Sequence, residues 1–164
     1  MYNTQTEITQ WTIAPLQITM NQTLNAPPEA IFQTLSDPEM MCNLFSWMDS
    51  VAIASPAASN TTTVGSLRTC ILGNGLILEE EIIDWQPPYG YAFRGIDATH
   101  PFGMRGHVGV LSFTPTECGC LFTWQQYFDH SNVPVMRQHL TQNMEAAIDT
   151  LKQSFGSCSV SKIN

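Results

Sequence analysis

A chain of 164 residues with 43% hydrophobic and 12% charged side chains has the composition of a folded protein of one domain. Fourteen acidic against six basic side chains give a net charge of −8, which disfavours nucleic acid and anionic membranes as partners. No apolar run approaches the roughly 18 residues of a membrane-spanning helix, so we expect no membrane span.

The two ends of the chain differ from its middle. Residues 1–16 are mainly polar and have neither the basic start nor the apolar run of a signal peptide. We expect a polar tail there and a second tail over residues 157–164. The remaining residues, 17–156, form the expected domain.

The cysteines are odd in number and lack the spacing of a disulfide framework or a metal site. They are Cys42, Cys70, Cys118, Cys120 and Cys158. The Cys118-Gly-Cys120 pair falls at an expected turn, and no second cysteine or histidine pair completes a metal site there. We therefore expect free thiols, a cytoplasmic location, and neither a metal nor a cofactor.

The first part of the chain predicts one strand and two short helices. Residues 17–24 alternate between apolar and polar, as in a strand with one buried face. Proline in a first helical turn then predicts a helix from Ala26-Pro27-Pro28-Glu29, with Glu29 near the positive end of the helix dipole. A second helix starts at Asp37-Pro38-Glu39, where Asp37 is the expected N-cap.

The rest predicts strands followed by one long helix. Strands are expected over residues 48–55, 64–72, 76–85, 89–96, 105–113 and 120–128. Loops are expected over residues 57–63 and 97–104. From Pro134 to Phe155 apolar residues recur at spacings of three and four, and Gly156 follows in the position of a helix C′ residue. This order of elements indicates an α+β fold.

A charged pair inside apolar strands is the most informative feature. Gly73-Asn74-Gly75 predicts a tight hairpin, because these residues accept positive φ at little cost. A three-residue loop pairs Arg68 with Glu80, whereas a two-residue loop pairs it with Glu81. We prefer Glu80, because it shares an apolar face. That face carries Leu76, Leu78 and Ile82. A half-buried ion pair is often neutral for stability, so its presence favours a role facing a ligand.

The alternation of side chains along each strand assigns the inner faces. In the last strand the inner residues are Cys120, Phe122, Trp124, Gln126 and Phe128. In the strand before it they are His107, Gly109, Leu111 and Phe113. Tyr91 and Phe93 share a face, which directs Arg94 to solvent. No spacing pattern marks the other histidines, which we expect at the surface. They are His100, His130 and His139.

Three stretches resemble a known superfamily. They are LNAPPEAIFQTLSDPEM, VGSLR followed by GLILEEEIIDWQPP, and RGHVGVLSFTPTECGCLFTWQQYF. With the final helix they cover Ile18 to Phe155 and are similar to the SRPBCC (START-like, Bet v 1-like) superfamily, in particular its polyketide cyclase/dehydrase and lipid-transport group. The resemblance implies a helix-grip fold. In that fold a curved antiparallel sheet of six to seven strands surrounds a long C-terminal helix, with two short helices after the first strand.

The resemblance also implies an internal cavity for a hydrophobic small molecule. We expect its lining to include Arg68, Glu80, Tyr91, Phe93, His107, Phe113, Phe122, Trp124 and Met144. Eight methionines suit a pocket that adapts to a flexible apolar ligand, and they equally suit a core that needs its gaps filled.

Three functions stay open. The first is binding or transport of a lipid, isoprenoid or polyketide-like molecule. The second is a polyketide cyclase/dehydrase-type reaction, in which Arg68 polarises a carbonyl and His107 or Glu80 moves a proton. The third is protein binding, as in Hsp90 co-chaperones. Under each function we expect a monomer or a homodimer. Each polar candidate also has a structural alternative: Arg68 and Glu80 as an ion pair of the scaffold, and His107 as a hydrogen-bonded core histidine.

Overall fold

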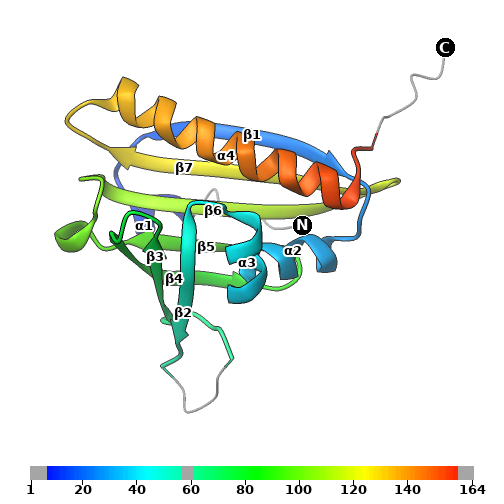
Figure 1. The fold of residues 1–164 in the computed structure, drawn as a ribbon, viewed down its shortest axis with the longest axis horizontal. Coiled ribbons are helices and arrows are strands. Elements are labelled where there is room, and N and C mark those ends of the chain that lie inside the picture. Colours follow the sequence, from blue (N-terminus) through cyan, green and yellow to red (C-terminus); the bar gives the residue numbers. More distant parts are fainter. Residues whose placement is uncertain (1–6, 57–60, 159–164) are drawn as a thin grey trace.

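The computed structural model describes residues 7–56 and 61–158, which form an antiparallel sheet with helices packed on it (Figure 1). The sheet has seven strands in the order β1-β7-β6-β5-β4-β3-β2. The strands are β1 (Leu16–Leu24), β2 (Met48–Ala54), β3 (Leu67–Leu72), β4 (Ile77–Gln86), β5 (Gly90–Gly95), β6 (Arg105–Thr116) and β7 (Gly119–Asp129). The predicted α+β helix-grip fold is confirmed.

The helices begin close to where proline and the capping residues predict. They are α1 (Ile8–Trp11), α2 (Pro28–Ser36), α3 (Pro38–Leu44), the 3-10 turn η1 (Asp97–Thr99) and α4 (Val133–Phe155). Asp37 caps α3 by accepting a hydrogen bond from the Met40 amide at 3.0 Å. Helix α4 ends at Gly156, which has a positive φ of 75° and donates its amide to the carbonyl of Lys152.

Helix α4 covers one face of the sheet along β1 and β7 (Figure 1). The core between this helix and the sheet contains the inner residues of β7 together with the apolar stripe of α4. From α4 it includes Met144, Ala147, Ile148 and Leu151. From β7 it includes Cys120, Phe122, Trp124 and Phe128. The predicted inner faces of β6 and β7 are confirmed.

The β3–β4 hairpin has the predicted three-residue loop. The Leu72 amide donates to the Leu76 carbonyl at 2.9 Å, and Gly75 takes a positive φ of 82°. This register places Arg68 opposite Glu80. Leu76 was expected on the apolar face but is 41% exposed, because it lies in the turn before β4 begins.

Strand β3 begins later than predicted. The sequence suggested a start at Val64, but Gly65 has a φ of 88° and the amide of Ser66 donates to the carbonyl of Thr63. This turn breaks the extended conformation, so the strand starts at Leu67.

Part of the expected polar tail over residues 1–16 is folded onto the sheet. Helix α1 packs Ile8 and Trp11 against the outer face of the sheet, and Thr12 donates its hydroxyl to the carbonyl of Gly106 at 2.7 Å. The outer face attracts this segment because it is itself apolar there. Its buried residues are Ala92, Val108, Val110 and Tyr127. Residues 1–6 lie outside the described part of the chain.

The expectation of five free thiols is wrong. Cys118 and Cys158 form a disulfide with a Cα–Cα distance of 6.1 Å. A bridge between Leu24 and Ser157 brings the segment after α4 to the β6–β7 turn, and this long-range contact could not be deduced from cysteine spacing. The free cysteines are Cys42, Cys70 and Cys120. Among the described residues, no helix combines the length and apolarity that crossing a membrane requires.

Candidate functional site

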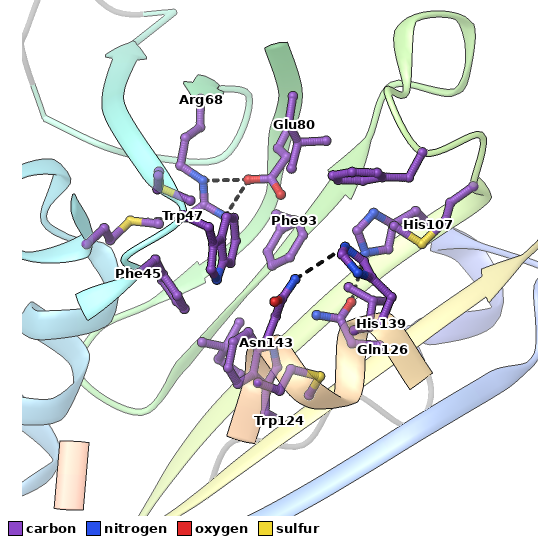
Figure 2. A pocket seen from close by; sticks show the side chains of 18 of the residues that line it. Phe45, Trp47, Arg68, Glu80, Phe93, His107, Trp124, Gln126, His139 and Asn143 are labelled. Atoms are coloured by element: carbon purple, nitrogen blue, oxygen red, sulfur yellow. Dashed lines mark hydrogen bonds and ion pairs between the residues drawn. The ribbon is translucent and has the colours of Figure 1, made fainter. Parts of the chain in front are cut away.

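A cavity of about 80 Å³ lies between the sheet and the first half of α4 (Figure 2). Most of its lining is apolar, with aromatic and methionine side chains from both short-helix and strand elements. The methionines are Met41, Met48, Met104 and Met144. A few polar groups enter this apolar lining, a pattern typical of ligand sites.

The principal polar feature is the ion pair between Arg68 on β3 and Glu80 on β4 (Figure 2). The Arg68 Nε and Nη2 atoms lie 2.7 and 2.6 Å from the same carboxylate atom, Oε2 of Glu80. Both side chains are about 95% buried, with 4% and 6% exposed. The guanidinium carbon lies 4.9 Å from the ring centre of Phe93, which adds a cation–π contact.

Burial alone would lower the pKa of Arg68, but the adjacent Glu80 carboxylate and the Tyr91 hydroxyl raise it above its ordinary value. Arg68 therefore stays charged, with its charge balanced by Glu80. The second carboxylate oxygen, Oε1 of Glu80, accepts no hydrogen bond from any residue that the structure describes. This acceptor is left for a molecule in the cavity.

Tyr91 fixes the ion pair to the helices. Its hydroxyl donates to the Leu35 carbonyl at the end of α2 and accepts a hydrogen bond from Arg68 Nη1 at 3.4 Å. Burial raises the Tyr91 pKa, so the phenol keeps its proton. Arg68 is thus held by Glu80 on β4 and by Tyr91 on β5, and Tyr91 is in turn held by Leu35 on α2.

A chain of hydrogen bonds joins His100, His107 and Gln126 beside the cavity. The amide of Phe102 donates to His100 Nδ1 at 3.3 Å, so a neutral His100 carries its proton on Nε2. That atom lies 3.1 Å from Nδ1 of His107, whose Nε2 lies 2.8 Å from Oε1 of Gln126. Every ring nitrogen therefore has a partner when both histidines are neutral.

The expected surface position of His100 is wrong. The segment after η1 folds it over Gly95, where a Cβ would come within 2.9 Å of His100 Cδ2 and 3.0 Å of His107 Nδ1. Glycine at this position allows the two rings to meet. Burial and the neighbouring His107 lower the His100 pKa to about 3, and burial also lowers the His107 pKa. His107 is a hydrogen-bonded core histidine with no free lone pair for a substrate proton.

Most of the predicted ligand-binding residues border the cavity. They are Arg68, Glu80, Tyr91, Phe93, His107, Trp124 and Met144. Phe113 and Phe122 instead belong to the packed core, where their rings stack with centres 5.4 Å apart. Their expected place in the lining is not found, because strand alternation predicts the face on which a side chain lies and not its depth.

The residues at the mouth of the cavity were not predicted from the sequence. Four residues border both the cavity and a groove of about 320 Å³ outside it. They are Trp47, Phe102, His139 and Asn143. Figure 2 shows the hydrogen bond between Asn143 and His139 at this point. The spacing of Leu140, Asn143 and Met144 on α4 could have indicated Asn143, whereas Trp47 and Phe102 lie in irregular segments without a pattern.

The fold and the internal cavity define a helix-grip protein. Residues 15–156 match the family described as polyketide cyclase / dehydrase and lipid transport. The chain belongs to this family. No curated protein sequence matches it.

Several solved structures share the fold. Protein MLL2253 from Mesorhizobium loti is 17% identical with a TM-score of 0.66, over 83% of this chain and 93% of that one. Protein XoxI from Bacillus cereus is 12% identical with a TM-score of 0.69, over 84% and 94% of the two chains. The Aha1 dimer from Colwellia psychrerythraea is 16% identical with a TM-score of 0.65, over 85% and 95%.

Proposed function

We propose that the protein binds an apolar small molecule in the cavity under α4, with the polar end of the molecule near Arg68 and Glu80. The observation that carries this proposal is a buried ion pair on the wall of a mostly apolar cavity. Such a pair contributes little to stability compared with apolar residues of similar volume. A lipid, isoprenoid or polyketide-like ligand fits the family to which the chain belongs.

The catalytic alternative has less support. A cyclase or dehydrase reaction needs a group that moves a proton, and both ring nitrogens of His107 already have protein partners. Burial raises the pKa of the Cys70 thiol to about 12, which keeps it protonated and unreactive. Among the described residues that border the cavity, Oε1 of Glu80 and the imidazole of His139 at the mouth remain as bases, and none is a serine, threonine, cysteine or lysine that could act as a nucleophile. Binding or transport is therefore the better proposal.

The protein-binding alternative predicts a filled interior, and the cavity counts against it. A cytoplasmic location stays a prediction, and the Cys118–Cys158 disulfide counts against it because cytosolic thiols are kept reduced. Whether the protein is a monomer or a homodimer is measured by light scattering.

Titration with N-phenyl-1-naphthylamine, a neutral apolar dye that fluoresces when buried, tests the proposal. We expect saturable binding to the wild-type protein, with the dye lying across the mouth between the cavity of about 80 Å³ and the groove of about 320 Å³, because the cavity alone is too small for its rings. Leu140→Trp should abolish it by filling the cavity, because Leu140 borders the cavity. The matched control on α4 is Val135→Trp, at a site that is 57% exposed. Absence of saturable binding, or equal binding by both variants, would contradict the proposal and favour the protein-binding alternative.

A further inference from the structure

Trp124 carries a buried hydrogen-bond donor without a partner. Its side chain borders the cavity from β7, the residue is 6% exposed, and Nε1 has no hydrogen-bond partner among the described residues. An indole N–H can only donate, and leaving it unpaired in a buried place is unfavourable. A molecule in the cavity that brings an acceptor oxygen to Nε1 would remove this cost, and because the Nε1 atom is itself covered, the surrounding side chains must shift slightly to admit that oxygen.

The charges that face the cavity cancel. Arg68 is balanced by Glu80, while His107 is neutral and Tyr91 keeps its proton. A carboxylate ligand would add a negative charge beside the unpaired Oε1 of Glu80, and the described lining residues include no arginine or lysine other than Arg68 to pair with it. A neutral oxygen carries no such penalty, and a hydroxyl could also donate to that Oε1.

The space available limits the size of the polar end. The inner cavity measures about 80 Å³, whereas a cavity of about 150 Å³ is known to hold one benzene. The groove of about 320 Å³ outside the mouth can take a larger apolar part. The dimensions therefore suit a compact polar head inside and an apolar body that passes the mouth at Trp47 and Phe102.

We propose that the cavity selects uncharged ligands with a carbonyl or hydroxyl oxygen at the end that meets Trp124, and that it rejects carboxylates of equal length. This selectivity rests on the proposed function, since it names the class of ligand for the same cavity. The carbonyl or hydroxyl oxygen accepts the Trp124 N–H, and the neutral head leaves the charge balance of Arg68 and Glu80 intact.

Displacement of N-phenyl-1-naphthylamine by undecan-2-one and by undecanoate at pH 8 separates the two kinds of head group. We expect the ketone to displace the dye at a concentration at least about tenfold lower, the difference that about 1.4 kcal/mol makes. Displacement by undecanoate at equal or lower concentration would overturn the inference while leaving apolar binding in place. Failure of the dye to bind would instead overturn the proposed function and this inference with it.

Trp124→Phe tests the donor directly. In direct calorimetric titration this variant should bind undecan-2-one about tenfold more weakly than the wild type does, as expected for one lost hydrogen bond. Trp11→Phe is the control, because Trp11 packs on the outer face of the sheet, away from the cavity. An unchanged ketone affinity in Trp124→Phe would overturn the role of Nε1.

Glu80→Gln tests the charge balance. It leaves the charge of Arg68 unpaired, so the preference should reverse and undecanoate should bind more tightly than the ketone. If the variant is unstable, undecanoate should raise its melting temperature more than undecan-2-one does. A preference for the ketone that persists in folded Glu80→Gln, or an equal thermal shift from both compounds, would contradict the argument from charge.

Discussion

Two buried neutral histidines make the stability of this protein sensitive to acid. Burial lowers the pKa of His100 and His107 in the folded state, so below their ordinary pKa of about 6.5 the unfolded state binds more protons. The free energy of unfolding should therefore be retained above pH 6.5 and fall as the pH decreases from 6.5 towards 3. Each histidine contributes at most about 1.4 kcal/mol per pH unit in this window.

Urea denaturation at pH 7.5, 5.5 and 4.5 measures this loss. Replacing one member of the pair in His100→Gln should reduce the dependence on pH. The control His139→Gln, at an exposed position of the mouth, should leave it unchanged. The same slope in wild type and His100→Gln would contradict the assignment of His100 as a buried neutral group.

At the level of single residues, the sequence predicted partners that follow from strand alternation. The pairing of Arg68 with Glu80 follows from the loop length of one hairpin, and the inward direction of Trp124 follows from its strand. His100 escaped prediction, because its position depends on how the irregular segment after η1 folds back over Gly95. The depth of a side chain below the surface was also not predictable. Phe113 and Trp124 share the inner side of the sheet, but Trp124 borders the cavity and Phe113 does not.

Glycine at position 109 of β6 leaves space for the Phe93 ring in the cavity wall. A Cβ on Gly109 would come within 3.0 Å of the Phe93 ring, the residue on which the Arg68 guanidinium stacks. Gly109→Ala should displace this ring, lower the free energy of unfolding by about 1 to 3 kcal/mol and weaken dye binding. Urea denaturation measures the first effect, and Gly73→Ala in the open β3–β4 turn is the control. Equal stability of both variants would contradict the prediction, because it would mean that the Phe93 ring can move away from an added Cβ at no cost.

The disulfide joins the segment after α4 to the β6–β7 turn. Its two cysteines are 40 residues apart, and a loop of that size corresponds to a stabilisation of up to about 4 kcal/mol in the chain-entropy treatment. Cys118→Ser combined with Cys158→Ser should lower the free energy of unfolding by up to this amount. Cys42→Ser, which removes a free thiol, serves as the control. Thiol titration of the unfolded, unreduced wild type should find three free cysteines rather than five.

At the level of elements, local signals predicted the helices and most strands well. Proline, Asp37 and Gly156 mark helix ends, and the Gly73-Asn74-Gly75 turn determines the hairpin register. The packing of α1 on the outer face was not predicted, because Ile8 and Trp11, which make its apolar contacts, lie in a segment that is otherwise mainly polar. The disulfide was missed for a related reason: it depends on where the chain goes after its last helix.

For the whole molecule, the central claim is that a helix-grip protein binds an apolar ligand whose polar end lies at a buried ion pair. A scaffold role for this pair makes a different prediction from a ligand role. Replacing both members by apolar residues in Arg68→Met/Glu80→Leu should leave the protein as stable as before or more stable, by up to about 4 kcal/mol. The matched outer variant is Arg94→Met/Glu81→Leu, since that ion pair lies half-exposed on the other side of the sheet.

The most direct test is calorimetric titration of these two folded variants and the wild type with undecan-2-ol, whose hydroxyl can donate to Oε1 of Glu80. The account predicts saturable binding to the wild type and the outer variant, and binding at least about tenfold weaker in the inner variant with its stability preserved. Equal affinity in all three proteins, or loss of stability without loss of affinity in the inner variant, would show that Arg68 and Glu80 serve the scaffold and not the ligand.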